Sequence, residues 1–179
     1  MIQKSNPVDL SEGVFIIMKE IKLSQGKVAL VDDEDFERVN EKVWHASKSR
    51  GLFYARSSTY VDKKCRCIHL HRYILNCENI EIEIDHIDGN GLNCQKKNLR
   101  ECTHSQNMMN KKPYKNGTSL YKGVHFQKSN NKYVATIRIN GKQKHLGYYT
   151  KEIDAAIEYD KNAIKYYGEF ARLNISINQ

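Results

Sequence analysis

The chain has 179 residues, and its 29 lysines and arginines exceed its 21 aspartates and glutamates to give a formal net charge of +8. That length allows one large domain or two small ones. No apolar run approaches the length that a membrane-spanning helix needs, and the N-terminus lacks the layout of a signal peptide, so we expect no membrane partner.

The positive charge is distributed unevenly along the chain. Residues 1–45 carry 6 basic and 9 acidic side chains, residues 46–118 carry 13 and 7, and residues 119–179 carry 10 and 5. The first part is therefore acidic and the other two are basic. Basic surfaces attract polymers of phosphate, so we expect a nucleic acid to bind the central and C-terminal parts.

The chain contains an odd number of cysteines and no CxxC pair. They are Cys65, Cys67, Cys77, Cys94 and Cys102. Structural zinc sites usually need paired cysteines, and disulfides form mainly outside the cytoplasm. We therefore expect reduced thiols in a cytoplasmic protein.

Residues 1–51 are expected to form a small N-terminal region without catalytic residues. The β-like runs VFIIM and KVALV flank the turn Ser24-Gln25-Gly26, a pattern typical of a hairpin. Residues 32–42 begin with acidic side chains and have helical apolar spacing, which predicts a short helix. Trp44 is expected to anchor the core.

Residues 52–110 are expected to form the central domain, which begins with a second hairpin over residues 52–58 and 65–71. Apolar alternation then predicts a strand that ends at Asp85 and His86. The glycines that follow interrupt regular structure and force a loop. A short strand and a capping-box pattern then predict a helix that carries Asn107.

With its DGNGLN turn and its NLR and SQN triplets, the stretch DHIDGNGLNCQKKNLRECTHSQN resembles the catalytic motif of the HNH nucleases, in particular of the phage homing endonucleases. The resemblance implies a ββα-metal core. It also implies Asp85 and Asn107 as metal ligands, His86 as the general base and Asn98 as the residue that holds the loop. His104 is the alternative for the last position of the motif, where the spacing favours Asn107.

The chemistry that this resemblance implies is phosphodiester hydrolysis. A neutral imidazole can take a proton from water near neutral pH. A divalent ion can polarise the phosphoryl group and stabilise the leaving oxygen. Carboxylate and amide oxygens are hard ligands, so the expected cofactor is one Mg²⁺ or Mn²⁺ ion per active site.

A histidine and an arginine, His71 and Arg72, precede the motif, as they do in the family. The resemblance implies that they contribute to the active site, where an arginine can bind the scissile phosphate with two hydrogen bonds. The alternative is that His71 is a buried side chain with its hydrogen bonds satisfied and that Arg72 is a surface group.

The C-terminal part begins after residues 111–118, KKPYKNGT, which are basic and rich in turn residues. They predict a linker that follows a DNA backbone without reading bases. Turn pairs at Asn130-Asn131 and Asn140-Gly141 then separate three predicted strands. A helix is predicted from Lys151 to Tyr167, started by Thr150 and stopped by Gly168.

Apolar periodicity predicts which faces of these elements pack together. In the middle strand, the residues expected to face the helix are Tyr133, Ala135, Ile137 and Ile139. Those expected to face outward are Val134, Thr136 and Arg138. The apolar stripe of the helix is expected to comprise Ile153, Ala156, Ile157, Ala163, Ile164 and Tyr167.

The pieces YKGV, KYVATIR, LGYYT, AAIEYDKNA and ARLN resemble, in this order, the apetala/ethylene-response-factor DNA-binding domain of plant transcription factors. The resemblance implies that the sheet enters the major groove. Lys122 and His145 replace an arginine and a tryptophan of that family, so its target sequence is not transferred. The implied DNA-binding residues are Lys122, His125, Gln127, Lys132, Thr136, Arg138, Gln143 and His145.

Together these features predict an α+β protein with an N-terminal hairpin and helix region, an HNH nuclease core, a linker, and a three-stranded antiparallel sheet packed on one helix. The last segment covers residues 119–179. The expected function is that of a site-specific homing endonuclease, monomeric on double-stranded DNA in a phage or bacterial host cell. Two alternatives remain open: a non-catalytic DNA-binding regulator on a decayed HNH fold, and an RNA-binding protein.

Overall fold

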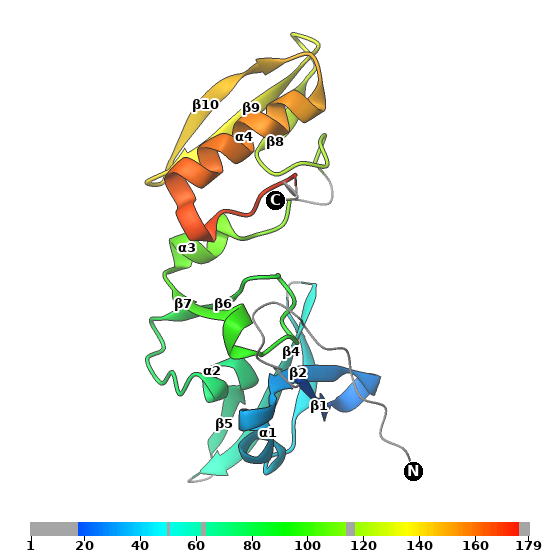
Figure 1. Cartoon of the computed structure of the whole chain (residues 1–179), viewed down its shortest axis with the longest axis vertical. Coiled ribbons are helices and arrows are strands. Elements are labelled where there is room, and N and C mark those ends of the chain that lie inside the picture. The colour runs from blue at the N-terminus through cyan, green and yellow to red at the C-terminus, as the bar shows by residue number, and fades with distance from the viewer. Residues whose placement is uncertain (1–17, 50, 62–63, 114–116, 176–179) are drawn as a thin grey trace, which may run out of the picture. The chain divides into compact units, whose positions relative to one another are not determined.

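The computed structural model describes residues 18–49, 51–61, 64–113 and 117–175 (Figure 1). The chain forms two compact units, one ending at Thr103 and the other beginning at His104. Both combine helices with small antiparallel sheets, which confirms the predicted α+β class. No helix in the described part of the chain is long and apolar enough to cross a membrane.

The first unit begins with an antiparallel hairpin of β1 (Met18–Lys22) and β2 (Val28–Asp32), joined by the predicted turn. Residues 14–17 of the first predicted strand lie outside the described residues. Helix α1 (Asp33–Asn40) follows, with three acidic residues in its first turn, where the helix dipole stabilises negative charge.

A three-stranded antiparallel sheet follows, in the order β3-β4-β5. Its strands are β3 (His45–Ser49), β4 (Leu52–Val61) and β5 (Lys64–His69). The second strand of the predicted hairpin ends earlier than expected, because the short helix α2 (Leu70–Ile74) begins at Leu70 and includes His71. Residues 62–63 of the predicted connection lie outside the described residues.

The last sheet of the first unit is an antiparallel hairpin of β6 (Glu83–His86) and β7 (Leu99–Cys102). Strand β6 ends at His86, as predicted from the apolar alternation before it. A loop and a single turn of 3₁₀ helix, Lys96–Asn98, connect the two strands.

One hydrophobic core joins all these sheets, because its buried residues come from every part of the first unit. They are Ile21, Leu23, Ala29, Val31, Val39, Trp44, Ala46, Ala55, Leu70, Ile74, Ile84, Cys94 and Leu99. Trp44 is buried, and its indole Nε1 donates a hydrogen bond to the carbonyl of Val39 at 2.8 Å, which confirms it as a core anchor. The N-terminal hairpin and α1 therefore help to form the scaffold of the β6-β7 hairpin.

The second unit contains a three-stranded antiparallel sheet in the order β10-β9-β8, and Figure 1 shows α4 lying along one face of it. Both central residues of the turn Asn140-Gly141 have positive φ angles, as a tight two-residue hairpin requires. The elements of this unit are α3 (His104–Met109), β8 (Val124–Gln127), β9 (Lys132–Ile139), β10 (Lys142–Tyr149), α4 (Glu152–Tyr167) and a 3₁₀ turn, Gly168–Phe170.

The predicted apolar stripe of α4 is wrong in part. Ile153, Ile157 and Ile164 are 39%, 40% and 50% exposed. The side chains that α4 buries are mostly small: Ala155, Ala156, Tyr159, Asp160 and Ala163. Alanines allow the helix to lie close to the sheet. The helix therefore turns its alanine face to the sheet and its isoleucines toward solvent. The predicted packing of Ala135 and Ile137 beneath the helix is confirmed.

Candidate active site

Asp85 is held by an arginine from the neighbouring strand. Asp85 on β6 lies directly opposite Arg100 on β7, and both side chains are largely buried. The Nε and Nη2 atoms of Arg100 donate hydrogen bonds to the Oδ2 atom of Asp85 at 3.0 and 2.7 Å. This pair fixes the orientation of the carboxylate at the end of the hairpin.

The ring of His86 lies in a cluster of aromatic side chains. Its centroid is 5.9 Å from that of Tyr54 and 5.0 Å from that of His71, to which it is perpendicular. His69 stacks on His71 at 5.2 Å. Residues from β4, β5, α2 and β6 therefore surround the predicted general base.

Burial keeps these imidazoles neutral. It lowers the pKa of His86 to about 4, against the opposing effect of the carboxylates of Asp88 and Asp85. It also lowers the pKa of His71 to about 2, with further contributions from the neighbouring His86, His69 and Arg72. At neutral pH the rings are therefore unprotonated, the form that a general base needs, while the lowered pKa makes His86 a weaker base than a free imidazole.

A buried thiol lies beside His86. The Sγ atom of Cys94 is 3.9 Å from its Nε2 atom. Burial, followed by the charge of Asp88, raises the pKa of Cys94 to about 12. The thiol therefore stays protonated and is a poor nucleophile.

The Nδ1 atom of His71 is buried and has no hydrogen-bond partner among the described residues, and the same is true of the Nε atom of Arg56. Arg56 on β4 lies opposite His69 on β5. Buried polar atoms without partners are uncommon in folded proteins and often mark the place of a ligand or water. Both atoms lie close to the histidine cluster, where an ordered water could satisfy them.

Asn98 holds the loop between β6 and β7. Its Nδ2 atom donates hydrogen bonds to Asp88 Oδ1 at 3.0 Å and to the carbonyl of Asn93 at 2.8 Å. Its Oδ1 atom accepts a hydrogen bond from the backbone N–H of Asp88 at 3.0 Å. Asn98 therefore stabilises the backbone conformation of the loop at Asp88 and Asn93.

The same loop is docked on the N-terminal hairpin. The backbone N–H of Leu30 donates to the carbonyl of Leu92, and the N–H of Cys94 donates to the carbonyl of Leu30, both at 2.8 Å. Asp32 accepts hydrogen bonds from the side chain of Gln95 at 3.1 Å and the backbone of Lys96 at 2.8 Å. The loop is thereby joined to β2.

Gly91 lets this loop approach β4 closely. A Cβ atom at this position would lie 2.5 Å from the carbonyl oxygen of Phe53 and 2.6 Å from the ring of Tyr54. Because one of these atoms belongs to the backbone, the contact could not be relieved by a side-chain rotation. Only glycine fits.

Arg72 is engaged in the fold. Its Nη1 atom donates to the carbonyl of Ile82 at 2.8 Å, and its Nη2 atom donates to the carbonyl of Asn79 at 2.6 Å. These hydrogen bonds fix the segment that leads into β6. Asn107, together with His104, lies in α3 of the second unit.

The donors at the end of β6 suit a hard divalent ion, because Asp85 offers a carboxylate. Within the described residues, no group of three or more His, Cys, Asp or Glu side chains surrounds a metal position. Mg²⁺ commonly takes one or two carboxylates from the protein and completes its shell with water and substrate oxygens, so Asp85 could serve as such a ligand.

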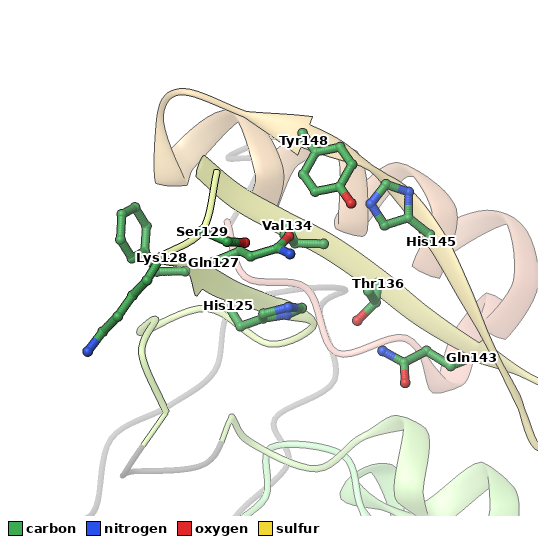
Figure 2. Close-up of a pocket in the computed structure, with 10 residues that line it drawn as sticks. His125, Gln127, Lys128, Ser129, Val134, Thr136, Gln143, His145 and Tyr148 are labelled. Carbon is green, nitrogen blue, oxygen red and sulfur yellow. The ribbon is translucent and has the colours of Figure 1, made fainter. Parts of the chain in front are cut away.

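In the second unit, five of the predicted DNA-binding residues line one hollow of about 650 Å³ on the sheet (Figure 2). They are His125, Gln127, Thr136, Gln143 and His145. Lys132 and Arg138 lie on β9 opposite Gln127 and Gln143. Lys122 is placed elsewhere, since its ammonium donates to the carbonyls of Met108 and Met109 at the end of α3.

Comparisons with known proteins identify the family to which the chain belongs. A model of the HNH endonuclease family matches residues 76–109. An uncharacterized HNH endonuclease, L560, from Acanthamoeba polyphaga mimivirus is 32% identical over 155 residues, covering 84% of this chain and 76% of the relative. The chain therefore belongs to the HNH endonuclease family.

A second relative is also viral. Protein 3.8 of Escherichia phage T7 is 42% identical over 60 residues, which cover 34% of this chain and 50% of the phage protein. Both relatives are therefore proteins of viruses, one of an amoeba virus and one of a bacteriophage.

Several residues near the site were missed by the sequence analysis: Tyr54, Arg56, His69 and Arg100. Arg100 belongs to the NLR triplet, so its place in the motif was a usable signal. Tyr54 and Arg56 come from β4, some 30 residues before His86; packing between sheets brings the ring of Tyr54 against His86, and register places Arg56 opposite His69.

Proposed function

We propose that this protein is a DNA endonuclease that hydrolyses a phosphodiester bond with His86 as general base and one Mg²⁺ or Mn²⁺ ion held by Asp85 and Asn107. The observation that carries the proposal is the position of His86. It follows the buried carboxylate of Asp85 at the end of β6, and its ring lies against Tyr54 and His71.

In this mechanism each residue has a distinct task. His86 takes a proton from the attacking water. Arg100 orients Asp85, and Asn98 holds the loop around them. The bound ion would polarise the phosphoryl group and stabilise the leaving 3′ oxygen. His71, whose ring packs against that of His86, completes the proposed site.

We propose that the second unit binds DNA and directs the nuclease to its target sequence. Its outer sheet face carries polar and basic side chains, and residues 119–179 have twice as many basic as acidic groups. Sheets that enter the major groove can contact base edges as well as phosphates. Arg138 is exposed and can form two hydrogen bonds with one guanine. We propose a site-specific enzyme of the homing type, monomeric on DNA.

A plasmid-nicking assay with and without Mg²⁺ tests the activity. The wild-type chain should convert supercoiled plasmid to the nicked or linear form only with the metal. His86→Ala should keep DNA binding and lose about 10²- to 10⁴-fold in cleavage rate, the usual contribution of general acid–base catalysis. His45→Ala, which changes an exposed histidine of β3, is the matched control and should cleave normally. Near-normal cleavage by His86→Ala would refute the assignment.

A further inference from the structure

One apolar side chain lies at the centre of the polar outer face of the second unit. Val134 on β9 lies directly between His125 on β8 and Tyr148 on β10. It is only 3% exposed, yet it lines the hollow on the side of the sheet away from α4. The hollow therefore has a hydrophobic floor.

A β-bulge forms one wall of the hollow. The register between β9 and β10 shifts between His145 and Gly147. Leu146 and Tyr149 pack into the core beneath α4, whereas His145 and Tyr148 both face the hollow, although they are three residues apart. Their rings are in contact, with centroids 4.6 Å apart. Figure 2 shows these two rings on one side of Val134 and His125 on the other.

Hydrogen-bonding groups surround this floor. The side chains of Gln127 and Gln143 lie at opposite ends of the hollow, and Thr136 lies opposite His145. A carboxamide can pair with the N6 and N7 atoms of adenine, and small apolar groups contact the 5-methyl group of thymine. A G·C pair offers no apolar group in the major groove. The combination of an apolar floor and an amide rim matches an A·T pair.

We propose that this hollow binds the 5-methyl group of a thymine in the major groove and makes the second unit select an A·T pair there. The inference rests on the proposed DNA-binding role of the sheet and specifies what the sheet reads. Val134 and the rings of His125 and Tyr148 contact the methyl group, and the glutamines contact adjacent base edges.

The test isolates the methyl group. Duplexes that bind the full chain are first selected from a random-sequence pool in EDTA, which prevents metal-dependent cleavage. The most enriched duplexes are then made with deoxyuridine in place of thymidine, which removes only the 5-methyl groups. Binding to the wild-type chain should weaken by about fourfold for one contacted methyl group.

Two variants of the same strand locate the effect. Val134→Ile adds one methylene to the floor of the hollow and should abolish or reverse the preference for thymine over uracil. Ile137→Val is the matched control, because it changes one methylene on the face covered by α4, and it should keep the preference.

The outcomes separate this inference from the proposed function. Equal affinity for thymine and uracil duplexes, with DNA binding otherwise intact, would overturn the hollow as a methyl site and leave the sheet as a DNA-binding surface. An equal thymine preference in the wild type and in Val134→Ile would also overturn it. Absence of DNA binding by the full chain would refute both.

Discussion

At the scale of single residues, the buried Asp85–Arg100 pair should matter for stability as well as for activity. Arg100→Ala would remove the guanidinium that pairs with the buried Asp85 carboxylate, and breaking a buried ion pair usually costs about 3–5 kcal/mol of unfolding free energy. Urea denaturation measures this loss. Adding Asp85→Asn removes the buried negative charge, so the double variant should be more stable than Arg100→Ala alone. A double variant that is less stable would contradict this account of the pair.

The neutral histidines predict a pH dependence of stability. In the unfolded chain an imidazole binds a proton below its ordinary pKa of about 6.5, whereas buried His71 binds one only near pH 2. The unfolded state thus binds more protons in acid. The unfolding free energy should fall by up to about 1.4 kcal/mol per pH unit for each such histidine as the pH drops from 6.5 toward 4.

His71→Phe tests this dependence, because phenylalanine keeps an aromatic ring and has no titrating nitrogen. Chemical denaturation at pH 7 and pH 5 should show a smaller difference for this variant than for the wild type. His45→Ala, at an exposed position, should keep the wild-type difference. An identical pH dependence in His71→Phe and the wild type would show that His71 titrates normally.

At the scale of elements, the contact between the β6-β7 loop and β4 should tolerate no side chain at residue 91. Gly91→Ala would place its Cβ atom against the carbonyl oxygen of Phe53, so the loop must shift. We expect a loss of about 1–3 kcal/mol in unfolding free energy, as for other overpacked sites, together with slower plasmid nicking.

Gly51→Ala is the control for this prediction, because its Cβ atom would meet open space and only its positive φ would be strained. It should lose about 1 kcal/mol and keep its nicking rate. Thermal denaturation and nicking measure the two effects separately. Unchanged nicking by Gly91→Ala would show that the loop can move without harm to the site.

The sequence predicted elements well where local signals agree. Strand β6 ends at His86, and Gly168 ends α4, because apolar alternation and glycine are both local signals. The buried face of α4 was predicted only in part: Ala156 and Ala163 are buried as expected, whereas Ile153, Ile157 and Ile164 are exposed because the sheet packs against the alanines. Arg100 reaches the site through strand register and Tyr54 through packing between two sheets, neither of which a single sequence encodes locally.

At the scale of the whole molecule, the net positive charge predicts a strong dependence of DNA binding on salt. Lys132→Ala on the outer sheet should weaken binding to all sequences alike and reduce the slope of log affinity against log salt by about one, because one phosphate contact is lost. Fluorescence anisotropy over a range of salt concentrations measures the slope.

Lys161→Ala is the matched control, since it removes an equal charge from an exposed position on α4. It should leave the slope nearly unchanged. If both variants reduced the slope equally, binding would depend on the total charge of the protein and not on the sheet face.

The parallel bridge between Leu30 and Asn93 limits which fragments of this protein could be moved into another protein. The loop beside His86 obtains backbone partners from a strand about 60 residues earlier in the chain. A recombination event that carried only residues 76–109 would transfer Asp85 and His86 but leave their loop without the backbone partners that β2 supplies. The smallest portable fragment of this active site therefore begins before β2, well upstream of the motif by which the family is recognised.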